Sequence, residues 1–488
     1  MPMTNVVEER GFFWWWQVSG DNQGTPPAAA ANGLLTISDE GHIKLKLDRE
    51  LPKDGPFPLP MRQAKPFPDG QMITGKLNDS GKIVLLDSIQ LTSFSWSDSP
   101  LRPEGYTADT CLIGDFPFDI SNVLDFSHFR IDLAGLNDWL NLGTIRSTMI
   151  DTDGENVEFS VKYERPSFSF KLDEFDLSIE TVTTTPNMLF DLGATCSVAF
   201  KQEFWLEFGN HAKTNLTSLK ADFICVEEFF AILMGSYLRL DWPYAVQGIG
   251  EDERWYRLYF FRGSVPEFEP GLGNTLTWFS WLRDSLGELF SNWKSKREQY
   301  GPGYYLYLAG LRNSDLYAEH RFVNLIWALE SLHRKKNSEK HVFDERIQKI
   351  LSKFQEPHEK EDLKWLKSKL RFACGPNLED RIFETFVGLP INLDRTALRK
   401  FAIKCQERRN QISHTGGPPD RESYSDFHQD LIYLTDALSH LYQAMLLQEI
   451  GLPEDKLKLA FTTGHLAGAR ILPSFRIFGL VDEVTPKS

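Results

Sequence analysis

Hydrophobic and polar positions alternate through much of the chain between Gly11 and Phe208, with the period of two that is typical of β-strands. From Ile43 to Leu47 apolar residues alternate with lysines, which predicts a strand with one buried and one solvated face. Six prolines in residues 51–69 predict a loop. The expected strands are 12–16, 34–37, 43–47, 83–86, 157–163, 168–172, 195–200 and 204–208. We therefore expect a β-rich, sandwich-like N-terminal region.

Helical spacing of apolar residues begins near Leu216 and predicts a helix that ends before Asp241. A strand-like run follows at residues 255–262. Residues 276–300 then have the spacing of one long amphipathic helix, which the Gly-Pro-Gly sequence at 301–303 should end. We place a domain boundary near the end of this helix.

The chain becomes almost entirely helical after this boundary. Glycine and proline pairs separate the predicted segments, as in a helical bundle with short loops. The expected helices are 315–335, 342–354, 359–374, 378–387, 394–414 and 424–451. The tail from Leu452 to Ser488 has a mixed pattern, with a strand expected at 475–480.

These patterns predict a multidomain α+β protein, in which a β-rich region precedes an all-α bundle. We expect a β-rich domain at 1–210 and a mixed α/β connecting region with a bridging helix at 211–303. A helical bundle should follow at 304–451, and the tail at 452–488 remains unassigned.

Charge is distributed unevenly between these parts. The whole chain has a net charge of −15, which argues against a protein that binds polyanions over its entire surface. Residues 311–450 hold 22 basic and 21 acidic residues, so the remainder holds 31 basic against 47 acidic. A nucleic-acid site therefore belongs in the nearly neutral bundle. The acidic N-terminal half could restrain such a site electrostatically.

The five cysteines are scattered, without the paired spacing of a zinc site or a disulfide framework. No cluster of Asp, Glu and His has metal-site spacing, so we expect neither a metal nor another cofactor. The N-terminus lacks the pattern of a signal peptide, and the longest apolar stretch, 229–238, is too short to span a bilayer. We expect a soluble cytoplasmic protein with no membrane partner.

The candidate catalytic side chains lie at the end of the predicted helix 394–414. Arg409, Asn410 and His414 precede a Gly-Gly-Pro-Pro sequence that should end this helix. Arg409 offers a planar fork for a phosphate, Asn410 could fix the arginine or an RNA backbone, and His414 could move a proton. Five residues along a regular helix turn about 140°, so Arg409 and His414 converge if the last turn unwinds. Alternatively, both side chains simply cap the helix end.

The residues Arg409-Asn410-Gln411-Ile412-Ser413-His414 match an R-N-x-x-x-H motif, and this segment resembles the HEPN superfamily, within it the ApeA-like HEPN proteins of bacterial antiphage defence. Residues 321–334 resemble the first bundle helix of that family. Residues 11–14 and 33–37 resemble its ApeA N-terminal domain.

This resemblance implies a metal-independent endoribonuclease, with transfer RNA as one candidate substrate. A ribose 2′-OH would attack the adjacent phosphate and leave 2′,3′-cyclic phosphate and 5′-OH ends. The N-terminal region would sense a phage-derived trigger or regulate the site, and the outcome would be abortive infection. One histidine per motif is short of the acid and base that this reaction favours, so we expect a homodimer with a composite site. The alternatives are a non-catalytic nucleotide- or RNA-binding module and a regulatory scaffold.

Glu330 lies among apolar positions of the predicted helix 315–335, where an unpaired carboxylate would be costly. It could hold Arg409 across the bundle, or pair with Arg334 one turn later on its own helix. The lysines at 335–336 and the basic residues between 364 and 371 could receive an RNA backbone, although such runs are more often solvated faces. We expect His320, His333, His341 and His358 at the surface.

Overall fold

The structure is a computed structural model that forms two compact units. The N-terminal unit comprises Met1–Asn137, Asn141–Glu227 and Arg239–Ser264, and the C-terminal unit comprises Asp138–Leu140, Glu228–Leu238 and Val265–Ser488. The residues described are 4–16, 26–51, 72–94, 103–118, 125–151, 157–184, 201–264, 268, 270–271, 273–313, 316–337, 352, 364–366, 376–419, 422–461 and 465–482.

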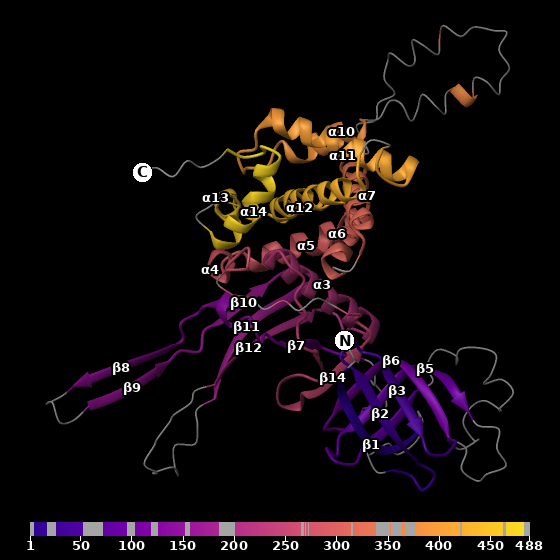
Figure 1. Ribbon diagram of the computed structural model, residues 1–488. Helices are drawn as coiled ribbons and strands as arrows, with labels where there is room; N and C mark the ends of the chain where they lie inside the picture. The colour runs from indigo at the N-terminus through magenta and orange to yellow at the C-terminus, as the bar shows by residue number, and fades with distance from the viewer. Residues whose placement is uncertain are drawn as a thin grey trace. The chain divides into compact units, whose positions relative to one another are not determined.

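Six antiparallel strands of the N-terminal unit close into a barrel (Figure 1). The strands follow the order β6-β3-β2-β1-β4-β5, and β5 pairs back onto β6. Their bounds are β1 Asn5–Trp15, β2 Ala31–Ser38, β3 Ile43–Leu47, β4 Ile73–Leu77, β5 Ile83–Phe94 and β6 Glu104–Gly114. Closure leaves β6 with β5 along one edge and β3 along the other, so the barrel has no unpaired strand at this seam.

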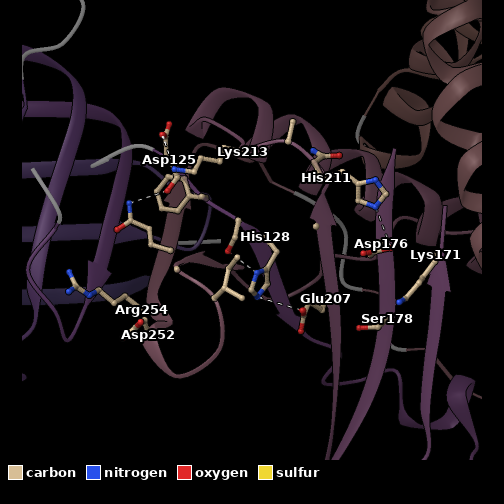
Figure 2. Close-up of a pocket in the computed structure, with 18 of the residues that line it drawn as sticks. Asp125, His128, Lys171, Asp176, Ser178, Glu207, His211, Lys213, Asp252 and Arg254 are labelled. Carbon is tan, nitrogen blue, oxygen red and sulfur yellow. Dashed lines mark hydrogen bonds and ion pairs between the residues drawn. The ribbon is translucent and has the colours of Figure 1, made fainter. Parts of the chain in front are cut away.

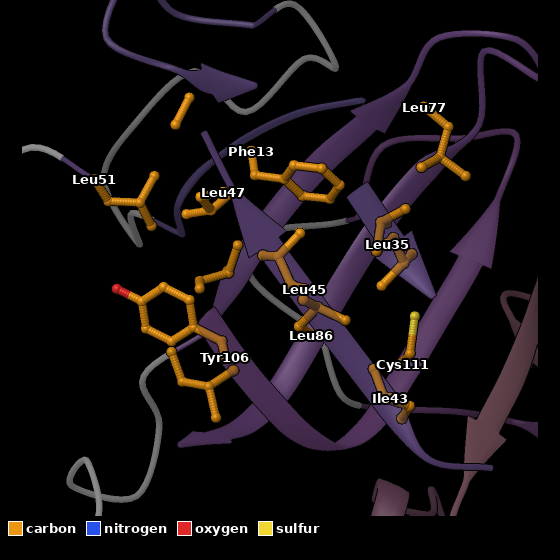
Figure 3. Packing of buried hydrophobic residues seen from close by; sticks show 14 of the residues in the cluster. Phe13, Leu35, Ile43, Leu45, Leu47, Leu51, Leu77, Leu86, Tyr106 and Cys111 are labelled. Atoms are coloured by element: carbon orange, nitrogen blue, oxygen red, sulfur yellow. The ribbon is translucent and has the colours of Figure 1, made fainter. Parts of the chain in front are cut away.

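The barrel interior is the hydrophobic core of this unit (Figure 3). Strand β3 shows the cause most directly, because Ile43, Leu45 and Leu47 are buried while the lysines between them are exposed. Burial of each such side chain contributes about 1.5–3 kcal/mol. Trp15 meets Tyr106 edge to face with ring centroids 6.1 Å apart, so this tryptophan packs in the core.

A second row of strands extends the sheet from β6, where β14 takes over from β3 along the same edge. The row continues β14-β13-β7-β12-β11-β10. Its bounds are β7 His128–Asp132, β10 Ser167–Lys171, β11 Phe175–Thr184, β12 Lys201–Asn210, β13 Tyr244–Gln247 and β14 Arg254–Phe260. Strands β8 (Ile145–Asp151) and β9 (Val157–Tyr163) form a separate two-stranded sheet. The β-rich region is confirmed, with a barrel and an extended sheet where a sandwich was expected.

The described part of the C-terminal unit is helical, which confirms an all-α region after the β-rich one. Helix α12 is its longest described helix and packs against α7 and α14, while α11 packs against α10. Its main helices are α5 Leu286–Tyr300, α6 Pro302–Arg312, α7 Ala318–Lys336, α10 Leu378–Phe386, α11 Arg395–Thr415 and α12 Tyr424–Glu449. The bounds of α7, α10, α11 and α12 lie within three residues of the prediction.

One helix prediction was wrong in detail, and one strand prediction was wrong. The single helix expected at 276–300 is divided into α4 (Phe279–Leu282) and α5, because the chain turns between them and Ser285 N donates to the carbonyl of Leu282 over 2.9 Å. The strand expected at 475–480 is instead the end of α14 (Leu466–Ile477), which follows α13 (Glu454–Ala460). Buried Ile471, Leu472 and Phe475 have the spacing of a helix, and the six residues 475–480 alone were too few to show it.

Several predicted elements lie outside the described residues, namely the strand at 195–200, the helix at 342–354 apart from residue 352, and most of the helix at 359–374. The sequence patterns did not find β4, β6, β7, β8, β11, β13 or α6. Helix α3 (Leu216–Met234) matches its prediction. Its first twelve residues belong to the N-terminal unit and the rest to the C-terminal unit.

Candidate active site

Helix α11 carries the predicted motif and is defined at both ends. At its start, Oδ1 of Asp394 accepts a hydrogen bond from N of Ala397 over 2.7 Å, as an N-cap does. At its end, Gly416 adopts a left-handed conformation with φ of 72°, which terminates the helix. The helix that presents the motif is therefore fixed by its own sequence.

The helix remains regular through His414 and Thr415, so the unwinding of the last turn that would let Arg409 and His414 converge does not occur. On a continuous helix, Arg409 and His414 lie about 140° apart around the axis and about 7.5 Å apart along it. Glycine follows His414 by two residues, too late to disturb the turn that holds the motif. The backbone alone does not bring the arginine and the histidine together.

Asn410 links the two positions. Nη1 of Arg409 donates a hydrogen bond to Oδ1 of Asn410 over 3.2 Å. Asn410 and His414 are one turn apart, so both side chains project from the same face of α11. The amide therefore draws the guanidinium toward the face on which His414 lies. In this geometry the side chains of Arg409 and Asn410 are in direct contact.

The preceding arginine, Arg408, has a different environment. It forms a two-pronged ion pair with Glu422, with distances of 2.5 and 2.6 Å, and its Nε donates to Asp430 over 2.8 Å. The guanidinium also lies over the ring of Phe427, 4.9 Å from its centroid. The hydrogen bonds that Arg408 donates to Glu422, and then the one to Asp430, raise the pKa of Arg408. Arg408 thus fastens α11 to the start of α12.

Arg409, Asn410 and His414 are left for other contacts. Asn410 and His414 are exposed, and Arg409 is half-buried with an Nε that has no hydrogen-bond partner in the described part of the chain. Neither Arg409 nor His414 forms an ion pair with a described residue. A cation, an amide and an imidazole at a solvent-facing helix end can bind a phosphate group and move a proton.

The structure does not bring Glu330 and Arg409 together. Glu330 is half-buried on α7, and it forms an ion pair with neither Arg409 nor Arg334 among the described residues. Its electrostatic neighbour is Arg381 on α10. Burial, and then the charge of Arg334, lower the pKa of Arg381, whereas Glu330 raises it. The expected brace across the bundle is therefore absent from the described geometry.

The histidines and lysines near the motif also differ from expectation in part. His333 is buried, with Nε2 2.8 Å from a carboxylate oxygen of Glu384, so its assignment to the surface was wrong. His320 is exposed as expected, and His341 and His358 lie outside the described residues. Lys336 pairs with Glu449, and Nζ of Lys335 donates to the carbonyl of Gln299 over 3.2 Å. These two lysines thus have contacts within the chain.

The C-terminal tail supports α11, which the sequence patterns did not reveal. N of Asp394, the cap residue, donates to the carbonyl of Leu480 over 2.9 Å. Phe478 meets Phe401 of α11 edge to face with centroids 5.1 Å apart, and Lys404 lies over the Phe478 ring. Contacts with α12 therefore hold α11 near the motif, and contacts with the tail hold the start of α11.

Two family models match the chain. The model of the ApeA N-terminal domain 1 matches residues 8–293, which is more than half of the chain, and the model of the Apea-like HEPN domain matches residues 323–456. The chain belongs to the ApeA-like HEPN family. Arg409, Asn410, His414 and Glu330 all lie within the HEPN match. No curated protein and no solved structure was found to match the chain.

Membership in the ApeA-like HEPN family suggests a nuclease-type effector of antiphage defence. HEPN domains typically act on RNA and dimerise. In the described residues, no three or more His, Cys, Asp or Glu side chains are grouped as metal ligands would be. None of the described helices combines the length and the apolar character needed to cross a membrane.

Proposed function

We propose that this ApeA-like HEPN protein is a metal-independent endoribonuclease of antiphage defence, with transfer RNA as one candidate substrate, and that Arg409 and His414 are its catalytic residues. The observation that carries the proposal is the contrast between adjacent arginines on α11. Arg408 is bound to Glu422 and Asp430, whereas the hydrogen-bond partner of Arg409 among the described residues is Asn410. Arg409, Asn410 and His414 therefore remain available to a substrate phosphate.

The proposed reaction begins when the ribose 2′-oxygen loses its proton and attacks the adjacent phosphorus. The bond from phosphorus to the 5′-oxygen then breaks, and that oxygen takes up a proton, which leaves a 2′,3′-cyclic phosphate and a 5′-OH end. Arg409 stabilises the negative charge that grows on the phosphate oxygens. His414 either removes the first proton or supplies the second. Both proton transfers need a group with a suitable pKa, and one motif contains one histidine.

A symmetric dimer supplies the second histidine. Because α11 stays helical through His414, the two catalytic residues of one chain point from different sides of the helix. Pairing of two chains about a two-fold axis near the ends of their α11 helices would place two Arg409 and two His414 side chains at one cleft. We infer that the site is composite and that the N-terminal unit regulates it in response to a phage-derived trigger.

The experiment compares RNA ends in cells that express the wild type, His414→Ala or Arg409→Ala under phage infection. We expect new 5′-OH ends with the wild type and a loss of at least 100-fold in each variant, about 2.7 kcal/mol or more of transition-state stabilisation. Addition of EDTA to the purified protein should leave cleavage intact. Equal RNA cleavage by the wild type and His414→Ala would refute the catalytic assignment.

Co-expression of the wild type with His414→Ala tests the composite site. Hybrid dimers of one wild-type chain and one His414→Ala chain then form, and they can be purified by two different affinity tags. If the shared cleft needs both histidines, each hybrid dimer is inactive. Hybrid dimers that still cleave RNA, while size-exclusion chromatography shows that they have formed, would indicate that each chain contains a whole site.

A further inference from the structure

The N-terminal unit contains a pocket of about 800 Å³ that the proposed nuclease site does not use (Figure 2). It lies over the outer face of β10, β11, β12 and β7, and it is bordered by the segment after β12 and by the turn between β13 and β14. Pockets that bind ligands typically have volumes of about 300–1000 Å³. A volume at the upper end of this range suits a ligand much larger than a single ion or amino acid.

Neutral polar side chains form much of the pocket wall, and several are held in place. Nδ2 of Asn210 donates to Asp222 over 2.6 Å, and Nε2 of Gln247 donates to the carbonyl of Asp125 over 3.3 Å. The hydroxyl of Ser127 donates to the carbonyl of Val246 over 3.0 Å. Ser169 and Ser178 are paired across β10 and β11 and add two hydroxyl groups. Hydroxyls and amides both donate and accept, as a ligand with alternating N–H and C=O groups requires.

The pair formed by His128 and Glu207 favours a ligand that donates hydrogen bonds. Nδ1 of His128 lies 2.9 Å from the hydroxyl of Ser127, which itself donates to Val246, so Nδ1 carries the proton of the neutral ring. Burial lowers the pKa of His128, although Glu207 opposes this. Nε2 therefore presents a lone pair 3.6 Å from the Glu207 carboxylate. A ligand N–H or ammonium group reaching Glu207 would relieve this contact between two acceptors.

Charges of both signs surround the opening of the pocket. Lys171, Lys213 and Arg254 are exposed cations, and Asp252 is an exposed anion. The His211 ring lies 3.4 Å from Asp176, and Lys213 lies 3.9 Å from Asp125. Such a balance does not favour a polyanion such as RNA, which needs an excess of cations.

Among the described lining residues, no Phe, Tyr or Trp ring is exposed for stacking a nucleobase or a sugar. Phe126 is fully buried, and the exposed imidazole in the lining, that of His211, lies beside the Asp176 carboxylate. Recognition of single-stranded nucleic acid relies on exposed aromatic faces. The volume, the wall of donors and acceptors, and the mixed charges together leave a polypeptide as the best match.

We propose that this pocket binds a short polypeptide segment of mixed charge, whose amide groups meet the serines and whose basic group meets Glu207. Acidic groups of the segment would meet Lys171, Lys213 or Arg254 at the opening. A pocket of this kind would allow a foreign protein to act on the N-terminal unit. The binding is independent of RNA cleavage, so it can be present or absent whether or not the bundle is a nuclease.

The test uses the full-length protein and a random dodecapeptide library displayed on yeast. Peptides that bind the wild type are counter-selected against Ser178→Trp, a change that places an indole in the pocket. The retained peptides are synthesised and titrated by fluorescence anisotropy. We expect at least tenfold weaker binding to Ser178→Trp and a similar loss in Lys171→Glu for acidic peptides. Lys46→Glu, which changes an exposed lysine of β3 outside the pocket, should bind as the wild type does.

Hydrogen exchange locates the bound peptide and tests the rival ligands. A retained peptide should slow exchange in β11 and β12, while ATP and a mixed-sequence dodecanucleotide RNA should not. If no peptide shows a tenfold dependence on Ser178 or Lys171, the proposal is wrong. Protection of β11 and β12 by ATP or by the RNA would also overturn it. Thermal melting of each variant shows whether it folds, and the rim variant Lys171→Glu keeps the test valid if Ser178→Trp does not.

Discussion

Arg409 and Asn410 are joined by a hydrogen bond from Nη1 to Oδ1 of 3.2 Å between side chains of adjacent residues. Neighbouring residues on a helix point about 100° apart, so this bond forms only because the long arginine bends toward the shorter amide. The bend brings the guanidinium toward the face that carries His414, one turn beyond Asn410. We propose that Asn410 is a positioning residue, which acts through Arg409.

Replacement of Asn410 separates positioning from catalysis. In Asn410→Ala the guanidinium loses its partner, and we expect kcat to fall about 10- to 100-fold, or about 1.4–2.7 kcal/mol, with little change in melting temperature. Asn410→Asp keeps an acceptor oxygen but adds a negative charge beside the phosphate, so KM should rise more than kcat falls. Steady-state kinetics on a defined RNA measure both constants.

Thr396→Ala is the control for these variants, because Thr396 is exposed on the same helix but lies far from the motif in sequence. It should retain wild-type kinetics. If Asn410→Ala and Asn410→Asp both match Thr396→Ala, Asn410 has no role in positioning.

Arg408 should contribute mainly to stability, and Arg409 should contribute mainly to activity. Arg408→Ala removes the guanidinium from Glu422 and Asp430, although Lys404 still pairs with Asp430, and the arginine side chain is 11% exposed. We expect a loss of about 2 kcal/mol in the free energy of unfolding. Arg409→Ala should change stability by less than about 0.5 kcal/mol while abolishing cleavage. Urea titration and RNA cleavage of both variants check this division, which would be contradicted if Arg409→Ala were the less stable of the two.

The sequence predicted α11 and its motif because both depend on local chemistry. Asp394 caps the start, Gly416 ends the helix, and the apolar spacing between them is regular. The adjacent arginines were not distinguished, since their difference comes from Glu422 and Asp430, which lie 14 and 22 residues away. Contacts between separate helices are set by packing rather than by local pattern.

Strands with one solvent-exposed face were predicted better than the others. Strand β3 alternates cleanly and was found, whereas β6 has long stretches of consecutive buried residues and was missed. In β6 one edge pairs with β5 and the other with β3 and then β14, so neighbours decide its burial. Closure of the barrel likewise depends on contacts between residues far apart in the sequence. Local alternation of apolar and polar residues does not report such contacts, so it led to the expectation of a sandwich.

A buried ion triad should stabilise the C-terminal unit. Glu228 is 4% exposed and lies 2.5 Å from Nε of Arg297 and 2.8 Å from Nη2 of Arg312. Glu228→Gln removes the charge between two guanidinium groups, and we expect a loss of about 2–3 kcal/mol in the free energy of unfolding. Glu298→Gln, on the exposed side of α5, should change it by less than about 0.5 kcal/mol. Equal unfolding curves for the two variants would show that the triad contributes nothing.

His440 should make the stability of the protein depend on pH between about 4 and 6.5. Burial lowers its pKa from 6.5 to about 4, while Nδ1 lies 3.0 Å from the hydroxyl of Ser474. Across this range the unfolded chain binds a proton that the folded chain does not, so acid favours unfolding. This lowering of the pKa corresponds to about 3 kcal/mol of stability, which is fully present above pH 6.5 and lost as the pH falls to 4.

Replacement of this histidine isolates its share of the acid sensitivity, since carboxylates titrate in the same range. His440→Gln keeps a hydrogen-bonding side chain but cannot gain a proton, so its free energy of unfolding should decrease less than that of the wild type between pH 6.5 and pH 4.5. His320→Gln, on the exposed surface of α7, should follow the wild-type slope. Urea unfolding at five pH values measures the slopes. Parallel slopes for His440→Gln and the wild type would mean that His440 titrates alike in the folded and unfolded chains.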